Sequence, residues 1–278
     1  MDYSQWVVAL VSAVVSFVTA YFLIPKEMIV RKFASQMDKE VEHYRHELEQ
    51  VARDEERRYR HDEIMKRYRA PLIHAVYELQ SRIYNIVVKG FADKYGKNGN
   101  DGQREYAVKN TAYVIAQYFA WSEIIRNEVQ LIEYDNPEET RRLSELRNKL
   151  YATWQTDDIQ DGFMFWAGEQ RAIGELMIEK TDSGAHCIGY AAFLEKFRNQ
   201  AHPLLKTLEV RVEKMIGGEA ACLSRLCRLH GLLIELLDLL DEDYRYFPKK
   251  VRGRIPEDSC NGASGLAAEI NPATERRV

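Results

Sequence analysis

The chain opens with 22 consecutive residues that carry no charge, from Tyr3 to Ile24. A helix of this length spans roughly 33 Å, which is enough to cross the hydrocarbon core of a bilayer. The residues are apolar or small on all sides of such a helix, and this uniformity argues against a buried helix of a soluble domain. We therefore expect residues 1–25 to form a transmembrane anchor, in which Tyr3, Trp6 and Ile24 contact the membrane.

A cleaved signal peptide is the main alternative for this stretch. Such a peptide needs a positively charged beginning and a small-residue cleavage site. Here only Met1 and Asp2 precede the apolar run, and Phe22, Leu23, Ile24 and Pro25 close it. The sequence therefore predicts that the anchor is permanent.

The charges that flank the anchor predict its orientation. Its C-terminal side carries Lys26, Arg31, Lys32 and Lys39, whereas no lysine or arginine precedes it. Positively charged flanks stay in the cytoplasm. We expect a single-pass membrane protein with its N-terminus outside and its body in the cytoplasm.

Composition narrows the possible partners. The net charge of -4 gives no general attraction to nucleic acid, so we expect no nucleic-acid partner. The four cysteines are irregularly spaced and do not indicate a disulfide framework. A cytoplasmic body would keep their thiols reduced.

The residues after the anchor predict a charged helical stalk, residues 26–69. Apolar residues recur there in alternating steps of four and three, which is the spacing of a short coiled-coil seam. The seam residues are Val30, Ala34, Met37, Val41, Tyr44, Leu48 and Val51. Beyond them the seam gives way to a segment of alternating charges, typical of a solvated helix. The seam predicts either an oligomer contact or a contact with another helix of the same chain.

The body, residues 70–247, has the 3.6-residue periodicity of packed helices, and no run alternates with period two. Pro71 should kink or restart the helix, because proline lacks an N–H. Residues 112–125 are apolar nearly all round, so we expect them to be buried. Further helices are predicted at residues 163–180, 189–216 with a break at His202 and Pro203, and 219–241. The predicted class is all-α, with a helical bundle as the body.

No motif in the sequence names a reaction. Cys222 and Cys227 fall on different faces of one predicted helix, and no second pair completes a four-ligand zinc site. Glu40 and His43 form a single E-x-x-H pair, whereas a di-iron bundle needs two such pairs and two further glutamates. We predict no metal and no cofactor, and the absence of a catalytic motif argues against an enzyme.

The stretch FMFWAGEQRAIGELM contains the most unusual polar residues. In a helix, Glu169 and Gln170 fall on the same face as Trp166, so they should be partly buried. A buried carboxylate needs a partner or a raised pKa, and either can mark a ligand site. The alternative is a structural ion pair with Arg82 or Arg126.

Two further polar groups are candidate contact surfaces. After Pro71, the residues His74, Glu78, Ser81 and Asn85 form a stripe with Arg82 beside it, in which Glu78 and Arg82 have the spacing of an ion pair. The stripe is either a recognition surface or a solvated face.

The C-terminal segment, residues 248–278, is rich in proline, glycine and charge and is predicted to be disordered. Its basic residues would contact anionic lipid or keep the tail soluble. They are Lys249, Lys250, Arg252 and Arg254.

These features favour a membrane-anchored cytoplasmic protein that acts as a protein-interaction or scaffold module. Its partners would be the lipid bilayer through residues 3–24 and a protein, or a second copy of the chain, through the stalk. The alternative is a membrane-tethered ligand sensor or enzyme with a polar cleft around Glu169.

Overall fold

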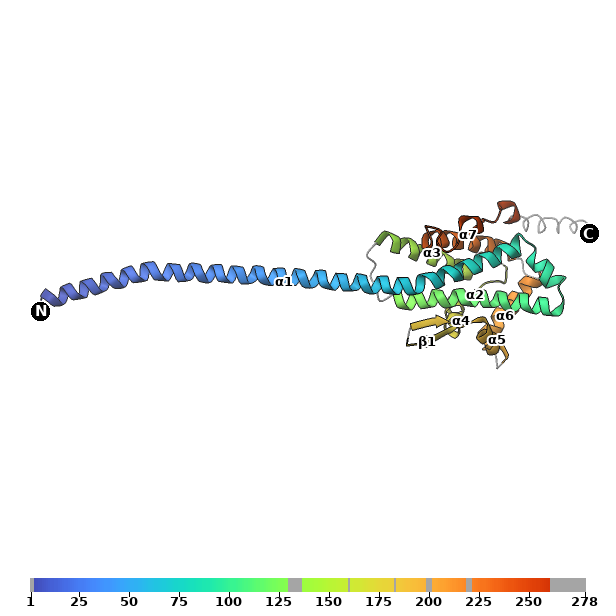
Figure 1. Cartoon of the computed structure of the whole chain (residues 1–278), viewed down its shortest axis with the longest axis horizontal. Helices are drawn as coiled ribbons and strands as arrows, with labels where there is room; N and C mark the ends of the chain where they lie inside the picture. The colour runs from blue at the N-terminus through green and yellow to red at the C-terminus, as the bar shows by residue number, and fades with distance from the viewer. Residues whose placement is uncertain are drawn as a thin grey trace, which may run out of the picture. The chain divides into compact units, whose positions relative to one another are not determined.

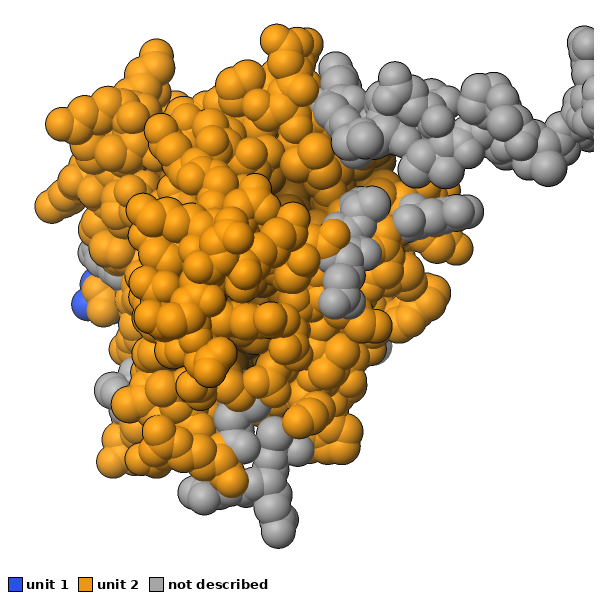
Figure 2. Space-filling model, turned by 90° about the vertical axis from the view of Figure 1, so that its right-hand side faces the viewer, with its two compact units in different colours: residues 1–60 blue, residues 61–278 orange. Residues whose placement is uncertain are grey.

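The computed structural model is mostly helical, which confirms the predicted all-α class (Figure 1). It describes residues 3–129, 137–159, 161–182, 184–198, 202–218 and 222–260. The chain divides into an N-terminal unit, residues 1–60, and a C-terminal unit, residues 61–278, whose surface is orange in Figure 2. The first helix, α1 (Tyr3–Val87), contributes residues to both units.

The N-terminal unit begins with a helical stretch, Tyr3–Phe22, that is long and apolar enough to cross a membrane. All of its side chains are exposed, including Tyr3 and Trp6, whereas the side chain of Ile24 lies outside the described part. The Thr19 hydroxyl donates a hydrogen bond to the Val15 carbonyl at 2.7 Å, so it needs no partner from solvent.

The seam residues of the predicted stalk are exposed along α1, with Val41 at 55% and Leu48 at 69%. They make no buried contact within their own unit. Neighbouring charges pair along the helix, as in Glu49 with Arg53 at 3.9 Å and Asp54 with Arg57 at 3.8 Å. Such pairs stabilise a solvated helix by a few tenths of a kcal/mol each, about 0.2–0.5.

Pro71 was predicted to kink or restart the helix, and the restart is wrong because α1 continues through Pro71 to Val87. Proline removes one backbone hydrogen bond and crowds the preceding turn. In the next turn Leu72, Ile73 and Val76 are almost fully buried. The burial of these side chains offsets the loss, because tertiary packing provides most of a helix's stability.

The core of the C-terminal unit lies around α2 (Asp101–Val129), which follows a short π-helix (Ala92–Lys97). Residues 112–125 of α2 are mostly buried, as predicted. Helix α2 packs against α4 (Ala167–Leu176) and α6 (Pro203–Gly217). Separately, α3 (Pro137–Gln155) packs against α7 (Leu223–Leu240), and the two helices lie side by side in Figure 1.

An aromatic cluster joins these layers. Phe119 of α2 meets Trp154 of α3 edge to face, with ring centroids 5.2 Å apart. Phe163 and Phe165, from the loop before α4, complete the cluster. Each such pair contributes about 0.5–1.5 kcal/mol beyond the area that it buries.

The loop that carries these phenylalanines is fastened by a fully buried ion pair. The guanidinium of Arg225, from α7, contacts the Asp161 carboxylate at 2.9 Å and donates to backbone carbonyls, among them Thr156 at 2.9 Å and Ile159 at 3.0 Å. Both side chains are inaccessible to solvent. A buried pair is tolerated only when its remaining polar groups are also satisfied, as they are here.

The helix predicted over residues 163–180 is shorter in the structure, and a hairpin follows it. Strands β1 (Ile178–Thr181) and β2 (Gly184–Cys187) pair antiparallel, with Ile178 opposite Cys187. Gly184 has a φ of 116°, which other residues rarely adopt, so the chain turns here. The Lys196 ammonium of α5 (Tyr190–Arg198) donates to the Leu176 carbonyl at 2.7 Å and so caps α4.

The break predicted at His202 and Pro203 is confirmed. Pro203 is the first residue of α6, and the His202 side chain accepts a hydrogen bond from the Leu204 N–H at 3.3 Å. Proline suits the first turn of a helix because its missing N–H has no partner there.

Candidate functional site

A polar cleft of about 320 Å³ lies between α1 and α2 of the C-terminal unit. One wall is the part of the predicted polar stripe that follows His74, and the other belongs to α2. His74 itself lies against Phe247, with ring centroids 5.0 Å apart. The lining residues are Tyr77, Glu78, Ser81, Arg82, Asn85, Asn110, Tyr113 and Val114. The volume is within the range of small-molecule sites, about 300–1,000 Å³.

Arg82 is the most unusual residue of this cleft. Its Nη2 donates to the side-chain oxygen of Asn110, and its guanidinium lies 4.3 Å from the centre of the Phe91 ring. Its Nη1 is buried and has no hydrogen-bond partner among the described residues. Burial lowers the pKa of Arg82, although the Tyr106 hydroxyl opposes this. The guanidinium is still charged, because arginine is not deprotonated in proteins.

Glu78 lies one helical turn before Arg82 and also lines the cleft. Their spacing predicts an ion pair, but among the side chains that the structure describes neither forms one. Arg82 turns to Asn110 and Phe91 instead. The cleft therefore holds one positive and one negative group that form no direct ion pair, although the Glu78 charge still acts on Arg82.

The wall on α2 provides neutral hydrogen-bonding groups. The Tyr113 hydroxyl donates to the Ile188 carbonyl at 3.3 Å, and burial raises its pKa to about 12. The nearby thiol of Cys187 has a pKa raised to about 12, again by burial. Because a thiol is a poor nucleophile when protonated, Cys187 does not supply a reactive group to this cleft. The arrangement is suited to binding.

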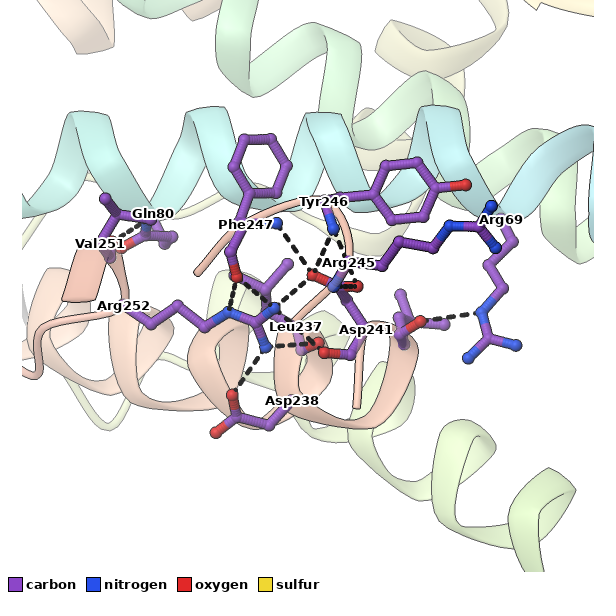
Figure 3. A network of polar contacts seen from close by, with 11 residues as sticks. Arg69, Gln80, Leu237, Asp238, Asp241, Arg245, Tyr246, Phe247, Val251 and Arg252 are labelled. Carbon is purple, nitrogen blue, oxygen red and sulfur yellow. Dashed lines mark hydrogen bonds and ion pairs between the residues drawn. The ribbon is translucent and has the colours of Figure 1, made fainter. Parts of the chain in front are cut away.

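The segment after α7 packs against α1, the helix that forms one wall of the cleft. We call residues 241–260 the C-terminal strap. Phe247 of the strap stacks on Tyr77, a lining residue, with ring centroids 3.7 Å apart. The side-chain amide of Gln80 on α1 also donates to the Val251 carbonyl at 3.4 Å (Figure 3).

Polar contacts hold the strap in shape. Figure 3 shows Arg252 reaching from the strap to Asp241 and to Asp238 of α7, the latter at 2.9 Å. The Arg252 guanidinium also donates to the Phe247 carbonyl at 2.7 Å. Burial raises the pKa of Asp241, but N–H groups led by those of Phe247 and Tyr246, together with Arg252, outweigh it and lower the pKa. The Asp241 carboxylate is therefore charged, and both of its oxygens accept hydrogen bonds from the strap.

The strap differs from the disordered tail predicted from residue 248 onward. It includes a short 3-10 helix (Lys249–Val251), while residues 261–278 lie outside the described part. Arg252, predicted to contact lipid, is 5% exposed and bonded within the strap. Lys249, Lys250 and Arg254 are the exposed members of the basic cluster.

A disulfide joins the end of the strap to α7, between Cys227 and Cys260. In a cytoplasmic body both thiols were expected to be reduced, and the disulfide in the structure corrects this expectation. The two cysteines are 33 positions apart, and nothing in the sequence between them indicates that they are close. They meet because the strap returns to α7.

The second predicted site, around Glu169, is occupied by the protein itself. Arg211 of α6 binds the Glu169 carboxylate through both of its terminal nitrogens, at 2.8 and 3.0 Å. The Trp166 N–H adds a bond of 2.9 Å. Burial raises the pKa of Glu169, but these bonds outweigh it and lower the pKa. Neither Arg82 nor Arg126, the partners suggested by the sequence, takes part.

The neighbours of Glu169 also differ from the predicted ligand site. Gln170 is buried, and its side-chain amide donates to the Phe165 and Tyr151 carbonyls at 2.9 and 3.2 Å. Trp166 is 55% exposed, because α4 begins only at Ala167. The hydrogen bonds of Glu169 and Gln170 fix α4 in place.

Sequence reasoning missed the wall of the cleft that α2 provides. Asn110 and Tyr113 are spaced as neighbours on one helix face within a largely apolar segment. That spacing was the available signal. What it could not show is that this face lies against the stripe on α1.

No family model matches the chain, and no match of significance is found among the curated proteins or among the solved structures. The function therefore has to be argued from the residues described above.

Proposed function

We propose that this chain is a single-pass membrane protein that associates with a second copy of itself through residues 30–51. In this proposal its helical C-terminal unit acts as an interaction module on the cytoplasmic side. The observation that carries the proposal is the apolar helical stretch Tyr3–Phe22, all of whose side chains are exposed.

Lipid is the environment that suits this helix. The helix exposes apolar side chains on all sides. Examples are Val8, Leu10 and Phe17, which are 68%, 65% and 73% exposed. Soluble proteins rarely leave a continuous apolar patch of more than a few hundred Å² in water. A bilayer removes this surface from water, since the helix has the length of its hydrocarbon core.

Two observations bear on the orientation and point in opposite directions. The basic flank after the anchor favours a cytoplasmic body. The bond between Cys227 and Cys260 favours an oxidising compartment. We give priority to the flank, because it acts during insertion, whereas disulfides in cytoplasmic proteins are transient or redox-sensing.

Self-association is supported by the seam. Its residues have heptad spacing and are exposed, from Met37 at 46% to Leu48 at 69%. Alanine, methionine and tyrosine are weaker seam residues than leucine and isoleucine, so the contact in isolation would be marginal. Anchoring two copies in one membrane raises their effective concentration and favours a parallel dimer.

Cysteine crosslinking in membranes tests this dimer. The variants Val41→Cys and Leu48→Cys place a thiol on the seam, and His46→Cys places one on the opposite face of the same helix. Mild oxidation should convert the two seam variants to dimers and leave His46→Cys at the level of the unmodified chain. Equal yields from all three positions would overturn the seam, and so would no dimer at any of them.

A further inference from the structure

The cleft between α1 and α2 indicates a small-molecule site in addition to the proposed protein interaction. It places two opposite charges beside neutral hydrogen-bonding groups. We propose that this cleft binds a small zwitterionic carboxylate, of the class of free amino acids. The carboxylate contacts Arg82, and the ammonium group contacts Glu78.

The positive half of the site is Arg82. Its buried Nη1 has no hydrogen-bond partner among the described residues, and a buried donor without a hydrogen bond is unfavourable. The Tyr106 hydroxyl also acts on this guanidinium. Nη2 and the face of the guanidinium are already fixed by Asn110 and Phe91. The group is therefore held in one position before a ligand arrives, and bonds between guanidinium and carboxylate are among the strong ones.

The negative half is Glu78. Its side chain is exposed and forms no ion pair with any described residue. It also disfavours ligands with two negative charges, such as a phosphate monoester, which it would repel. A ligand with one carboxylate and one ammonium group satisfies both charges, whereas an anion alone satisfies only Arg82.

The size and walls of the cleft narrow the class further. A volume of about 320 Å³ corresponds to roughly ten water molecules at about 30 Å³ each. This suits a molecule of amino-acid size. The Tyr77 ring and Val114 provide an apolar surface, and the amides of Asn85 and Asn110 provide polar ones.

The experiment is isothermal titration of the full-length chain in detergent micelles with each of the common free amino acids. We expect at least one to bind with a dissociation constant below about 1 mM. For that amino acid, the C-terminal amide and the N-acetyl derivative should each bind at least tenfold more weakly. Binding of none, or equal binding of either derivative, would overturn the proposal.

Variants test whether Arg82 and Glu78 bind the two charged groups of the ligand. Arg82→Gln and Glu78→Gln should each weaken binding about tenfold, which corresponds to about 1.4 kcal/mol. The controls Arg228→Gln and Glu175→Gln change exposed residues elsewhere and should bind as the unmodified chain does. Asn110→Asp keeps the size of its side chain and places a carboxylate beside Arg82, so it should abolish binding while the thermal midpoint is retained. Unchanged binding by Arg82→Gln or by Asn110→Asp would contradict the assignment.

This test does not depend on the dimer or on the orientation of the anchor. Loss of amino-acid binding leaves the crosslinking result unaffected, so the two proposals can fail separately.

Discussion

Phe247 and Tyr77 lie face to face, with ring centroids 3.7 Å apart and ring planes 9° from parallel. Tyr77 lines the cleft on α1, and Phe247 belongs to the C-terminal strap. The stack therefore connects the polar network of the strap to the wall of the cleft.

This stack should be measurable as a coupling energy. Phe247→Leu keeps an apolar side chain but removes the ring contact, and it should lower the free energy of unfolding by about 1 kcal/mol. A double-mutant cycle with Tyr77→Leu, followed by chemical denaturation, should give a coupling of about 0.5–1.5 kcal/mol. Additive effects would show that the rings do not stabilise each other.

Arg252 should matter far more than its basic neighbours. Arg252→Met leaves the buried carboxylate of Asp241 without its cation, so the free energy of unfolding should fall by about 3–5 kcal/mol. Lys250→Met, an exposed position two residues earlier, should change it by less than about 0.5 kcal/mol. Similar effects for the two variants in denaturant titrations would mean that the strap is not held by Arg252.

His230 should make stability depend on pH. It is 1% exposed, and burial, with a contribution from Arg254, lowers its pKa from 6.5 to about 4. The folded state binds a proton at His230 less well than the unfolded state does. The stabilisation that neutral His230 gives to the folded state is therefore complete above pH 6.5 and is lost as the pH falls toward 4. The loss should be about 3 kcal/mol.

The measurement is the free energy of unfolding at several values between pH 7 and pH 4. In His230→Leu the part of the slope due to this residue should disappear. A variant that keeps the full slope would show that other groups carry the pH dependence.

The disulfide should stabilise the oxidised protein. Opening the bond between Cys227 and Cys260 releases a loop of 33 residues, and reductant should lower the free energy of unfolding by about 2–4 kcal/mol. The double variant Cys227→Ser and Cys260→Ser should behave as the reduced protein, whereas Cys222→Ser, at a buried free cysteine, should keep its response to reductant. Insensitivity of the unmodified chain to reductant would contradict the bond.

Elements whose pattern repeats locally were predictable from the sequence. The helical class, the burial of residues 112–125 and the start of α6 at Pro203 follow from periodicity and from helix-start signals. Gly174 lets α4 approach α2 closely, because a Cβ there would lie 2.7 Å from the Phe119 carbonyl oxygen. At Gly168 the same atom would meet nothing within 4 Å.

Features that depend on contacts between distant segments were not predictable. Glu169 was recognised as a buried carboxylate in need of a partner, but Arg211 lies 42 residues away and on another helix. The hairpin has strands of four residues, which are too short to show alternation. The strap has the composition of a disordered tail, yet Arg252 finds Asp241 and Asp238 within the fold.

Membrane extraction with a topology readout tests the central claim most directly. Membranes from cells that express the full chain are washed with alkaline carbonate, and the C-terminus is probed with a label that does not enter intact cells. We predict that the intact chain stays in the membrane pellet, that its C-terminus is labelled only after the cells are opened, and that Val14→Arg weakens retention by placing a charge within the span. Recovery of the native chain in the soluble fraction with a trimmed N-terminus, or labelling of its C-terminus on intact cells, would contradict the account.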